Sequence, residues 1–201
     1  MDTLTQLRSF GPVLAKRWSR GPDGKPEELR RDPAKHFAVI EHPVGSVFDL
    51  VTALDSLSGD RLSCVIRGQL KLWQNPLRVR RTNEAFFDVP RWYSLHDFDS
   101  VECPPWIDWR KEPNAAAAFL RSLLPPEFHE ATCYWSFTGG QGFKRELRMR
   151  LAFWHDRRVA GAELKAWLGE KEPVVAVPSA PPSRPQHLPP RPADLHGSSN
   201  P

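Results

Sequence analysis

The chain has 201 residues, with 28 Lys and Arg against 24 Asp and Glu, and a formal net charge of +4. That length suits one domain, or one domain with a tail. No apolar run approaches the roughly 18 residues of a membrane span, and the N-terminus lacks the basic-then-apolar order of a secretory signal. Three scattered cysteines without C-x-x-C spacing argue against a disulfide scaffold and a structural zinc site. We therefore expect a cytoplasmic protein that does not contact membranes.

Proline content divides the chain. Nine of the 21 prolines fall in residues 171–201, a segment without aromatic residues. Such a segment cannot bury enough apolar surface to offset the entropy of ordering it. We expect a folded domain over residues 1–170 and a disordered, proline-rich tail over residues 171–201.

Strands and helices alternate along the expected domain. The pattern predicts, in chain order, a strand at 3–10, a polar loop at 21–32, a helix at 46–57 capped by Ser46, strands at 62–67 and 91–98, a helix at 115–124, strands at 131–137 and 147–154, and a helix at 162–168. This order favours an α+β fold with helices on one face of a sheet over a parallel α/β fold.

The sharpest local feature is the acidic pair in the segment WYSLHDFD. Asp97 and Asp99 are two apart on a predicted strand, so they share a face about 7 Å apart. Two carboxylates in this arrangement suit one or two Mg²⁺ or Mn²⁺ ions, such as those that activate a hydroxyl and stabilise pyrophosphate in nucleotidyl transfer. D-x-D pairs also occur at exposed strand ends, where aspartates make turns. His96 points to the other face, where a structural role is expected.

A second strand carries arginines. Arg148 and Arg150 share one face, and the guanidinium fork binds phosphate oxygens in bidentate fashion, which suits a triphosphate or a nucleic-acid backbone. Salt bridges to neighbouring acids are the alternative. The preceding glycine-rich segment, FTGGQGF, lacks the order of a P-loop and indicates a hairpin turn.

Further basic residues lie in loops or at strand ends: Lys16, Arg67, Arg80 and Arg81. Such residues are most often solvated. Beside the sheet, they would extend a cationic track for a nucleic-acid template.

The order of these features resembles the catalytic domain of archaeo-eukaryotic primase-polymerases, specifically the primase-like proteins of phages, plasmids and integrated elements. The resemblance covers about residues 10–168 and includes VLAKRW, SVFDLVTALDSL, CVIRG, VRR, RWYSLHDFDS, RSLLPPEF, CYWSFTGG, RMRLAFWHDRRV and ELKAWL. It implies an RRM-like sheet with helices packed on one face, plus an N-terminal α/β part.

The resemblance also implies roles for the candidate residues. The catalytic metal ligands, for Mg²⁺ or Mn²⁺, would be Asp97 and Asp99. The chemistry of the basic residues described above would supply the other contacts: Arg148, Arg150 and Arg67 would bind the nucleotide phosphates, and Lys16, Arg80 and Arg81 the single-stranded DNA template. The Ser-x-His motif of the family is replaced here by Arg148-Met149-Arg150, and its third acidic motif is missing, which indicates a domain truncated at its C-terminal side.

Three hypotheses follow. The first is a DNA-directed primase/polymerase-type nucleotidyltransferase of a mobile genetic element, which acts in DNA replication on nucleoside triphosphates, with a helicase as a further partner. The second is a catalytically defective, nucleic-acid-binding remnant of the same fold. The third is an interaction protein whose proline-rich tail docks on a partner.

Overall fold

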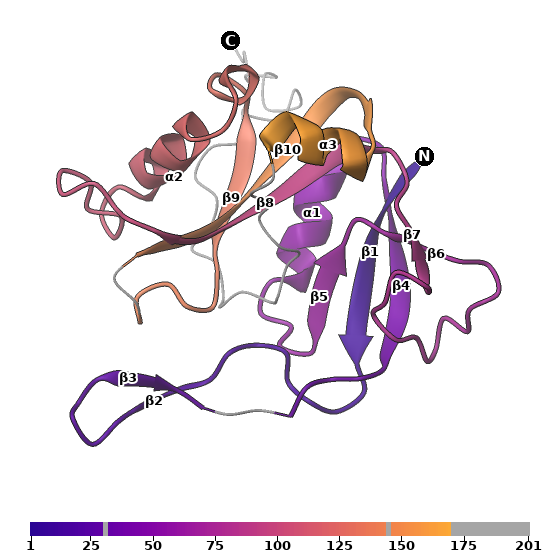
Figure 1. Cartoon of the computed structure of the whole chain (residues 1–201), viewed down its shortest axis with the longest axis horizontal. Helices are drawn as coiled ribbons and strands as arrows, with labels where there is room; N and C mark the ends of the chain where they lie inside the picture. Colours follow the sequence, from indigo (N-terminus) through magenta and orange to yellow (C-terminus); the bar gives the residue numbers. More distant parts are fainter. Residues whose placement is uncertain (30–31, 144–145, 170–201) are drawn as a thin grey trace, which may run out of the picture.

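The computed structural model describes residues 1–29, 32–143 and 146–169 (Figure 1). The elements in chain order are β1 (Asp2–Ser9), β2 (Trp18–Arg20), β3 (Pro26–Glu28), β4 (Phe37–Val44), α1 (Val47–Leu57), β5 (Ser63–Ile66), β6 (Gln69–Leu70), β7 (Phe86–Phe87), β8 (Arg91–Val101), α2 (Pro113–Ser122), a 3₁₀ turn (Pro126–Phe128), β9 (Cys133–Phe137), β10 (Leu147–Val159) and α3 (Gly161–Leu168). The chain is thus a mixed α+β protein with antiparallel sheets. The expected tail, residues 171–201, lies outside the described residues.

The N-terminal sheet has the order β4-β1-β5, and both neighbours run antiparallel to β1. Helix α1 connects β4 to β5. Ser46 caps this helix, since its side chain accepts a hydrogen bond from Asp49 N. The buried side of α1, which includes Leu50 and Leu54, packs into a core shared with Leu4 of β1. The apolar spacing that predicted this helix is therefore the spacing that buries it.

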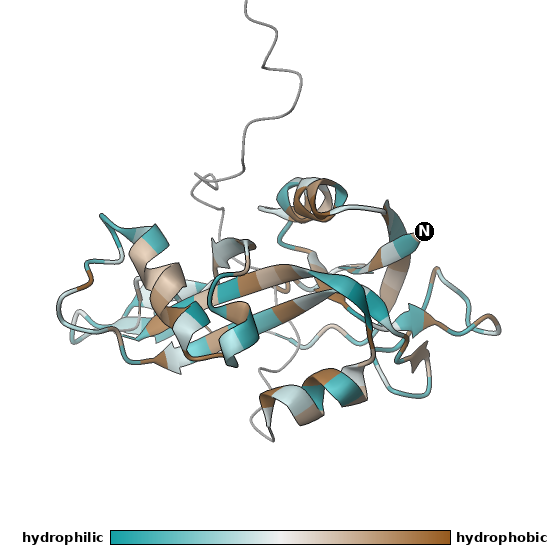
Figure 2. Ribbon diagram, turned by 90° about the horizontal axis from the view of Figure 1, so that it is seen from above, coloured by the Kyte–Doolittle hydropathy of each residue, from teal (hydrophilic) through white to brown (hydrophobic). Residues whose placement is uncertain are grey.

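The second sheet has the order β8-β10-β9 and is also antiparallel. One face packs on α2, α3 and the 3₁₀ turn through Leu120, Leu164 and Phe128. The other face packs towards α1 through Tyr93 and Tyr134. Figure 2 shows the sheet between α1 on one side and α3 on the other.

The helices and strands predicted from sequence are present, with changed ends. β8 continues to Val101 and β10 to Val159, because pairing between these two strands extends beyond their apolar segments. Three features were not predicted: the short pair β2–β3, whose second strand lies inside the expected polar loop at 21–32, β4, and the short pair β6–β7. No helix in the described part of the chain has the length and apolar character needed to span a membrane.

Candidate phosphate and metal site

The two acids of the D-x-D segment face the two arginines of the neighbouring strand. Asp97 lies opposite Arg150, whose Nε donates to Oδ1 at 2.5 Å and whose Nη2 donates to Oδ2 at 3.2 Å. Towards the end of the sheet, Arg148 Nη1 donates to Asp99 Oδ1 at 2.7 Å. We call these four residues the acid–arginine ladder. The salt-bridge alternative for the arginines is thus realised, and the acids that pair with them are those of the candidate metal site.

Burial differs along the ladder. The side chains of Arg148 and Arg150 are each 7% exposed, whereas those of Asp97 and Asp99 are 11% and 64% exposed. Burial raises the pKa of Asp97, and the charge of Arg150 opposes that rise. Buried ion pairs recover little of the cost of removing charges from water, so they are weak evidence for a purely stabilising role. The ladder has a closed inner pair and an outer pair that opens to solvent at Asp99.

A β-bulge shapes the open end. The register shifts between Leu147 and Met149, so that Asp99 and Ser100 together oppose Arg148. Ser100 has φ 64°, in the left-handed region that non-glycine residues rarely adopt. Arg148, which already donates to Asp99, also donates through Nη2 to Ser100 Oγ. The bulge therefore aims two side chains of β8 at one guanidinium, and the backbone strain is of the kind that collects at functional sites.

The glycine-rich turn holds Arg148 from the other side. Thr138 N donates to the Arg148 carbonyl at 2.9 Å, and Arg148 N donates to Gln141 Oε1 at 2.6 Å. A Cβ at Gly140 would lie only 2.8 Å from Arg148 Cδ, so glycine is needed there for close approach. Two buried donors, Arg148 Nε and Gln141 Nε2, meet no acceptor within the described residues.

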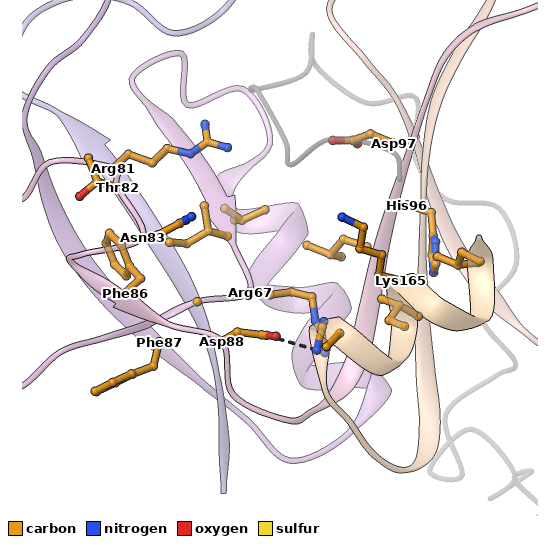
Figure 3. A pocket seen from close by; sticks show the side chains of 18 residues that line it. Arg67, Arg81, Thr82, Asn83, Phe86, Phe87, Asp88, His96, Asp97 and Lys165 are labelled. Atoms are coloured by element: carbon orange, nitrogen blue, oxygen red, sulfur yellow. Dashed lines mark hydrogen bonds between the residues drawn. The ribbon is translucent and has the colours of Figure 1, made fainter. Parts of the chain in front are cut away.

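Asp97 also lines a pocket of about 580 Å³ between β5, the segment before β7, β8 and α3. Figure 3 shows Arg81 and Asp97 on opposite walls, with Arg67 between them. Arg67 Nη2 donates to the Val159 carbonyl at 2.6 Å, and burial lowers the pKa of its guanidinium. The charge of Arg81 acts to lower the pKa of Asp97 across the pocket. Three residues singled out from sequence therefore meet in one cavity.

Lys165 on α3 is a third cation of this pocket, beside Arg67 and Arg81, and sequence reasoning missed it. Its helix is anchored there by Asp88, which accepts a hydrogen bond from Gly161 N at 3.2 Å. No local signal in the sequence could have found Lys165, because only tertiary packing brings α3 beside β8.

The remaining predicted nucleic-acid residues lie outside this pocket. Arg80 is exposed and lines two neighbouring depressions. Lys16 pairs with Glu28 at 3.5 Å beside the β2–β3 pair. The strand pair β2–β3 contacts the glycine-rich turn, because Trp18 Nε1 donates to the Gly139 carbonyl at 2.9 Å. Lys16 thus belongs to the ladder end of the molecule, and Arg80 to the rim beyond the pocket.

His96 occupies the opposite face of β8, as the alternation predicted. Ser94 Oγ lies 2.7 Å from His96 Nε2 and 2.9 Å from His155 Nε2. Phe128 and Phe153 contact the His96 ring edge-on. Burial lowers the pKa of His96 to about 3. This neutral, fully buried histidine packs on the sheet face opposite the ladder, and it also borders the Asp97 pocket at the edge of the sheet.

The chemistry of the acids suits a hard cation. Carboxylate oxygens are preferred ligands of Mg²⁺, which usually completes its shell with water and substrate phosphates. Across residues 1–29, 32–143 and 146–169, however, no three His, Cys, Asp or Glu side chains are grouped to hold a metal ion. Asp97 and Asp99 could supply two carboxylate ligands to such an ion, and the described residues place no third acid, His or Cys beside them.

Comparison with known proteins identifies no relative: no protein-family model matches the chain, and no curated protein or solved structure is significantly similar to it.

Proposed function

We propose that this chain is a primase/polymerase-type nucleotidyltransferase domain that binds a nucleoside triphosphate at the acid–arginine ladder and joins nucleotides on a nucleic-acid template. The observation that carries the proposal is the register of β8 and β10, which sets two carboxylates against two buried arginines with the outer pair open to solvent. The motif order that resembles primase-polymerases supports the choice of reaction.

Substrate binding would exchange the partners within the ladder. Without substrate, Asp97 and Asp99 neutralise the arginines, so no buried cation is left alone. Phosphate oxygens match the guanidinium fork as carboxylates do. A triphosphate at the open end takes over Arg148 first and then Arg150, which frees the two acids. The donors Arg148 Nε and Gln141 Nε2 gain an acceptor in the same event.

The freed acids would hold Mg²⁺ or Mn²⁺ together with the phosphates. When bound, the metal supplies Lewis-acid stabilisation of the charge that develops at the reacting phosphate. The adjoining pocket is lined by Arg67, Arg81 and Lys165 together with Asp88, so this part of its lining has an excess of positive charge that would favour an anionic substrate. The pocket volume lies within the range of about 300–1,000 Å³ that is usual for small-molecule sites.

Within this proposal, the sheet β8-β10-β9 with α2 and α3 is the RRM-like unit, and β1, β4, β5 and α1 form the N-terminal α/β part. The support is that the D-x-D strand and the arginine strand are neighbours in one antiparallel sheet with two helices on a single face.

A second candidate is a nucleic-acid-binding remnant of the same fold that no longer catalyses transfer. One observation favours it: the described residues contain no third acidic ligand near Asp97 and Asp99. Two carboxylates alone hold a divalent ion weakly, so nucleotide binding could survive where chemistry does not.

The test is primer synthesis and extension by the full chain with Mg²⁺ or Mn²⁺, nucleoside triphosphates and a single-stranded template. Wild-type protein should incorporate nucleotides only with metal. Asp97→Asn should reduce incorporation by at least about 100-fold, since the metal contributes several kcal/mol to transition-state stabilisation. Glu102→Gln is the matched control, because Glu102 is an exposed acid just beyond β8; it should behave as wild type.

The outcomes separate the two candidates. Metal-dependent incorporation that Asp97→Asn leaves unchanged would remove the ladder from the mechanism. Salt-dependent binding of single-stranded DNA without incorporation by the wild type would assign the chain to the non-catalytic remnant.

A further inference from the structure

Two exposed aromatic rings lie together at the rim of the Asp97 pocket. Trp73, just after β6, is 69% exposed, and Phe87, which ends β7, is 45% exposed. The rings meet edge to face, with centroids 5.8 Å apart. Phe87 also lines the pocket. Two adjacent exposed rings make this rim a candidate interaction surface.

A lysine is held against both rings. Lys71 Nζ lies 4.9 Å from the centroid of Phe87 and 5.7 Å from that of Trp73. The same Nζ donates to the Asn83 carbonyl at 3.1 Å, and Lys71 N donates to the Ala85 carbonyl at 3.0 Å. The β6–β7 pair therefore positions a cation and two rings before any partner arrives.

The charge around these rings indicates the kind of partner. Residues 67–88 contain five Lys and Arg and two acids. Proteins that bind single strands without sequence preference combine stacking rings with cations that follow the phosphate backbone. A purely apolar partner surface would gain nothing from this excess of positive charge.

We propose that Trp73, Phe87 and Lys71 form a stacking platform for single-stranded nucleic acid. The choice of nucleic acid rests on the proposed function. Bases stack on the two rings, while Lys71 and the arginines of residues 78–81 bind the backbone. Because Phe87 belongs to both surfaces, a strand on the platform continues directly into the pocket that Asp97 lines.

The test is the fluorescence anisotropy of a labelled oligothymidylate of about 20 nucleotides, measured with the full chain in EDTA and without nucleotide. Wild-type binding should weaken as salt rises. Trp73→Ala and Phe87→Ala should each raise the dissociation constant by about 5- to 150-fold, the range for loss of one base–aromatic stack. Trp73→Phe should retain most of the affinity.

The matched control is Trp106→Ala. Trp106 is 78% exposed in the loop between β8 and α2, at the other end of the molecule in Figure 1 from β6 and β7. This variant should bind as wild type. Equal weakening by Trp106→Ala, wild-type affinity in Trp73→Ala and Phe87→Ala, or no binding by the wild type would each overturn the platform. Self-association that Trp73→Ala abolishes, without oligonucleotide binding, would also overturn it and assign the rings to a second copy of the chain.

Asp97→Asn separates this inference from the proposed function. It should lose incorporation but keep its affinity for the oligonucleotide. A failed platform with intact incorporation would remove this inference alone, whereas oligonucleotide binding on the platform without incorporation by the wild type would remove nucleotidyl transfer alone.

Discussion

A buried ion pair joins the two sheets and gives the sharpest stability prediction. Arg91 of β8 donates through Nη1 to Asp2 Oδ1 of β1 at 2.6 Å, and each side chain is 4% exposed. Arg91 Nε also donates to the Arg67 carbonyl at 3.0 Å. Arg91→Met keeps much of the side-chain volume but leaves the Asp2 carboxylate buried without its cation.

The expected loss of unfolding free energy depends on the hydrogen bonds that Asp2 keeps in the variant. Removal of one partner of a buried pair costs about 3–5 kcal/mol. The carboxylate still accepts from the backbone N–H groups of Thr3 and Trp92, both at 2.9 Å, so we expect the lower end, about 3 kcal/mol. With a urea m-value of about 2 kcal/mol/M, the unfolding midpoint should fall by about 1.5 M. Urea titration followed by tryptophan fluorescence measures this shift.

The matched control is Arg157→Met, which removes an exposed pair with Glu163 and should cost less than about 1 kcal/mol. Equal midpoint shifts for the two variants would refute the reasoning.

The pH dependence of stability provides a second check of the Asp2–Arg91 pair. Burial would raise the pKa of Asp2, but hydrogen bonds from Arg91, Trp92 and Thr3 outweigh it and hold the pKa below its ordinary value. Stability from this pair is present above about pH 4 and is lost as pH falls through the folded pKa, so wild type and Arg91→Met should converge in acid.

Two further predictions concern His96 and the glycine-rich turn. Because burial lowers the pKa of His96 to about 3, wild type should lose about 2 kcal/mol between pH 7 and about pH 5, as the unfolded histidine takes up a proton below about 6.5. His96→Gln, which can still bond to Ser94, should reduce that dependence in urea midpoints and leave the share of His155, whose pKa burial also lowers; an unchanged slope would contradict the prediction. Gly140→Ala should displace Arg148 and weaken ATP binding by about tenfold in calorimetry. The control is Gly11→Ala, whose added Cβ meets nothing within 4 Å and which should bind ATP as wild type does. Equal ATP affinities of Gly140→Ala and wild type would disprove that the glycine-rich turn positions Arg148.

Local sequence patterns predicted much of the secondary structure. Ser46 and the apolar spacing behind it define α1, because capping and helical periodicity act within a few residues. The unpredicted β4 shows the limit of such patterns. Its sequence FAVIEHPV contains Pro43, which a central strand would reject, and it is accommodated because β4 forms the edge of its sheet beside β1. The two- and three-residue strands depend on their partners, so no local pattern marks them.

Local patterns likewise predicted only part of the candidate site. Alternation along a strand placed Asp97 with Asp99, and Arg148 with Arg150, because side chains two apart point to one side. Only the pairing of β8 with β10 decided that these acids form ion pairs with these arginines, and that a bulge turns Ser100 towards Arg148.

Local sequence patterns were enough to predict which residue types lie on each strand face, where the main helices begin, and which segments carry charge. No such pattern predicts that residues from β5, α3 and the segment before β7 share a pocket with Asp97; that contact arises from packing between distant segments. The physical reason is that periodicity and capping depend on neighbours along the chain, whereas strand partners and helix docking depend on burial of apolar surface shared by distant segments.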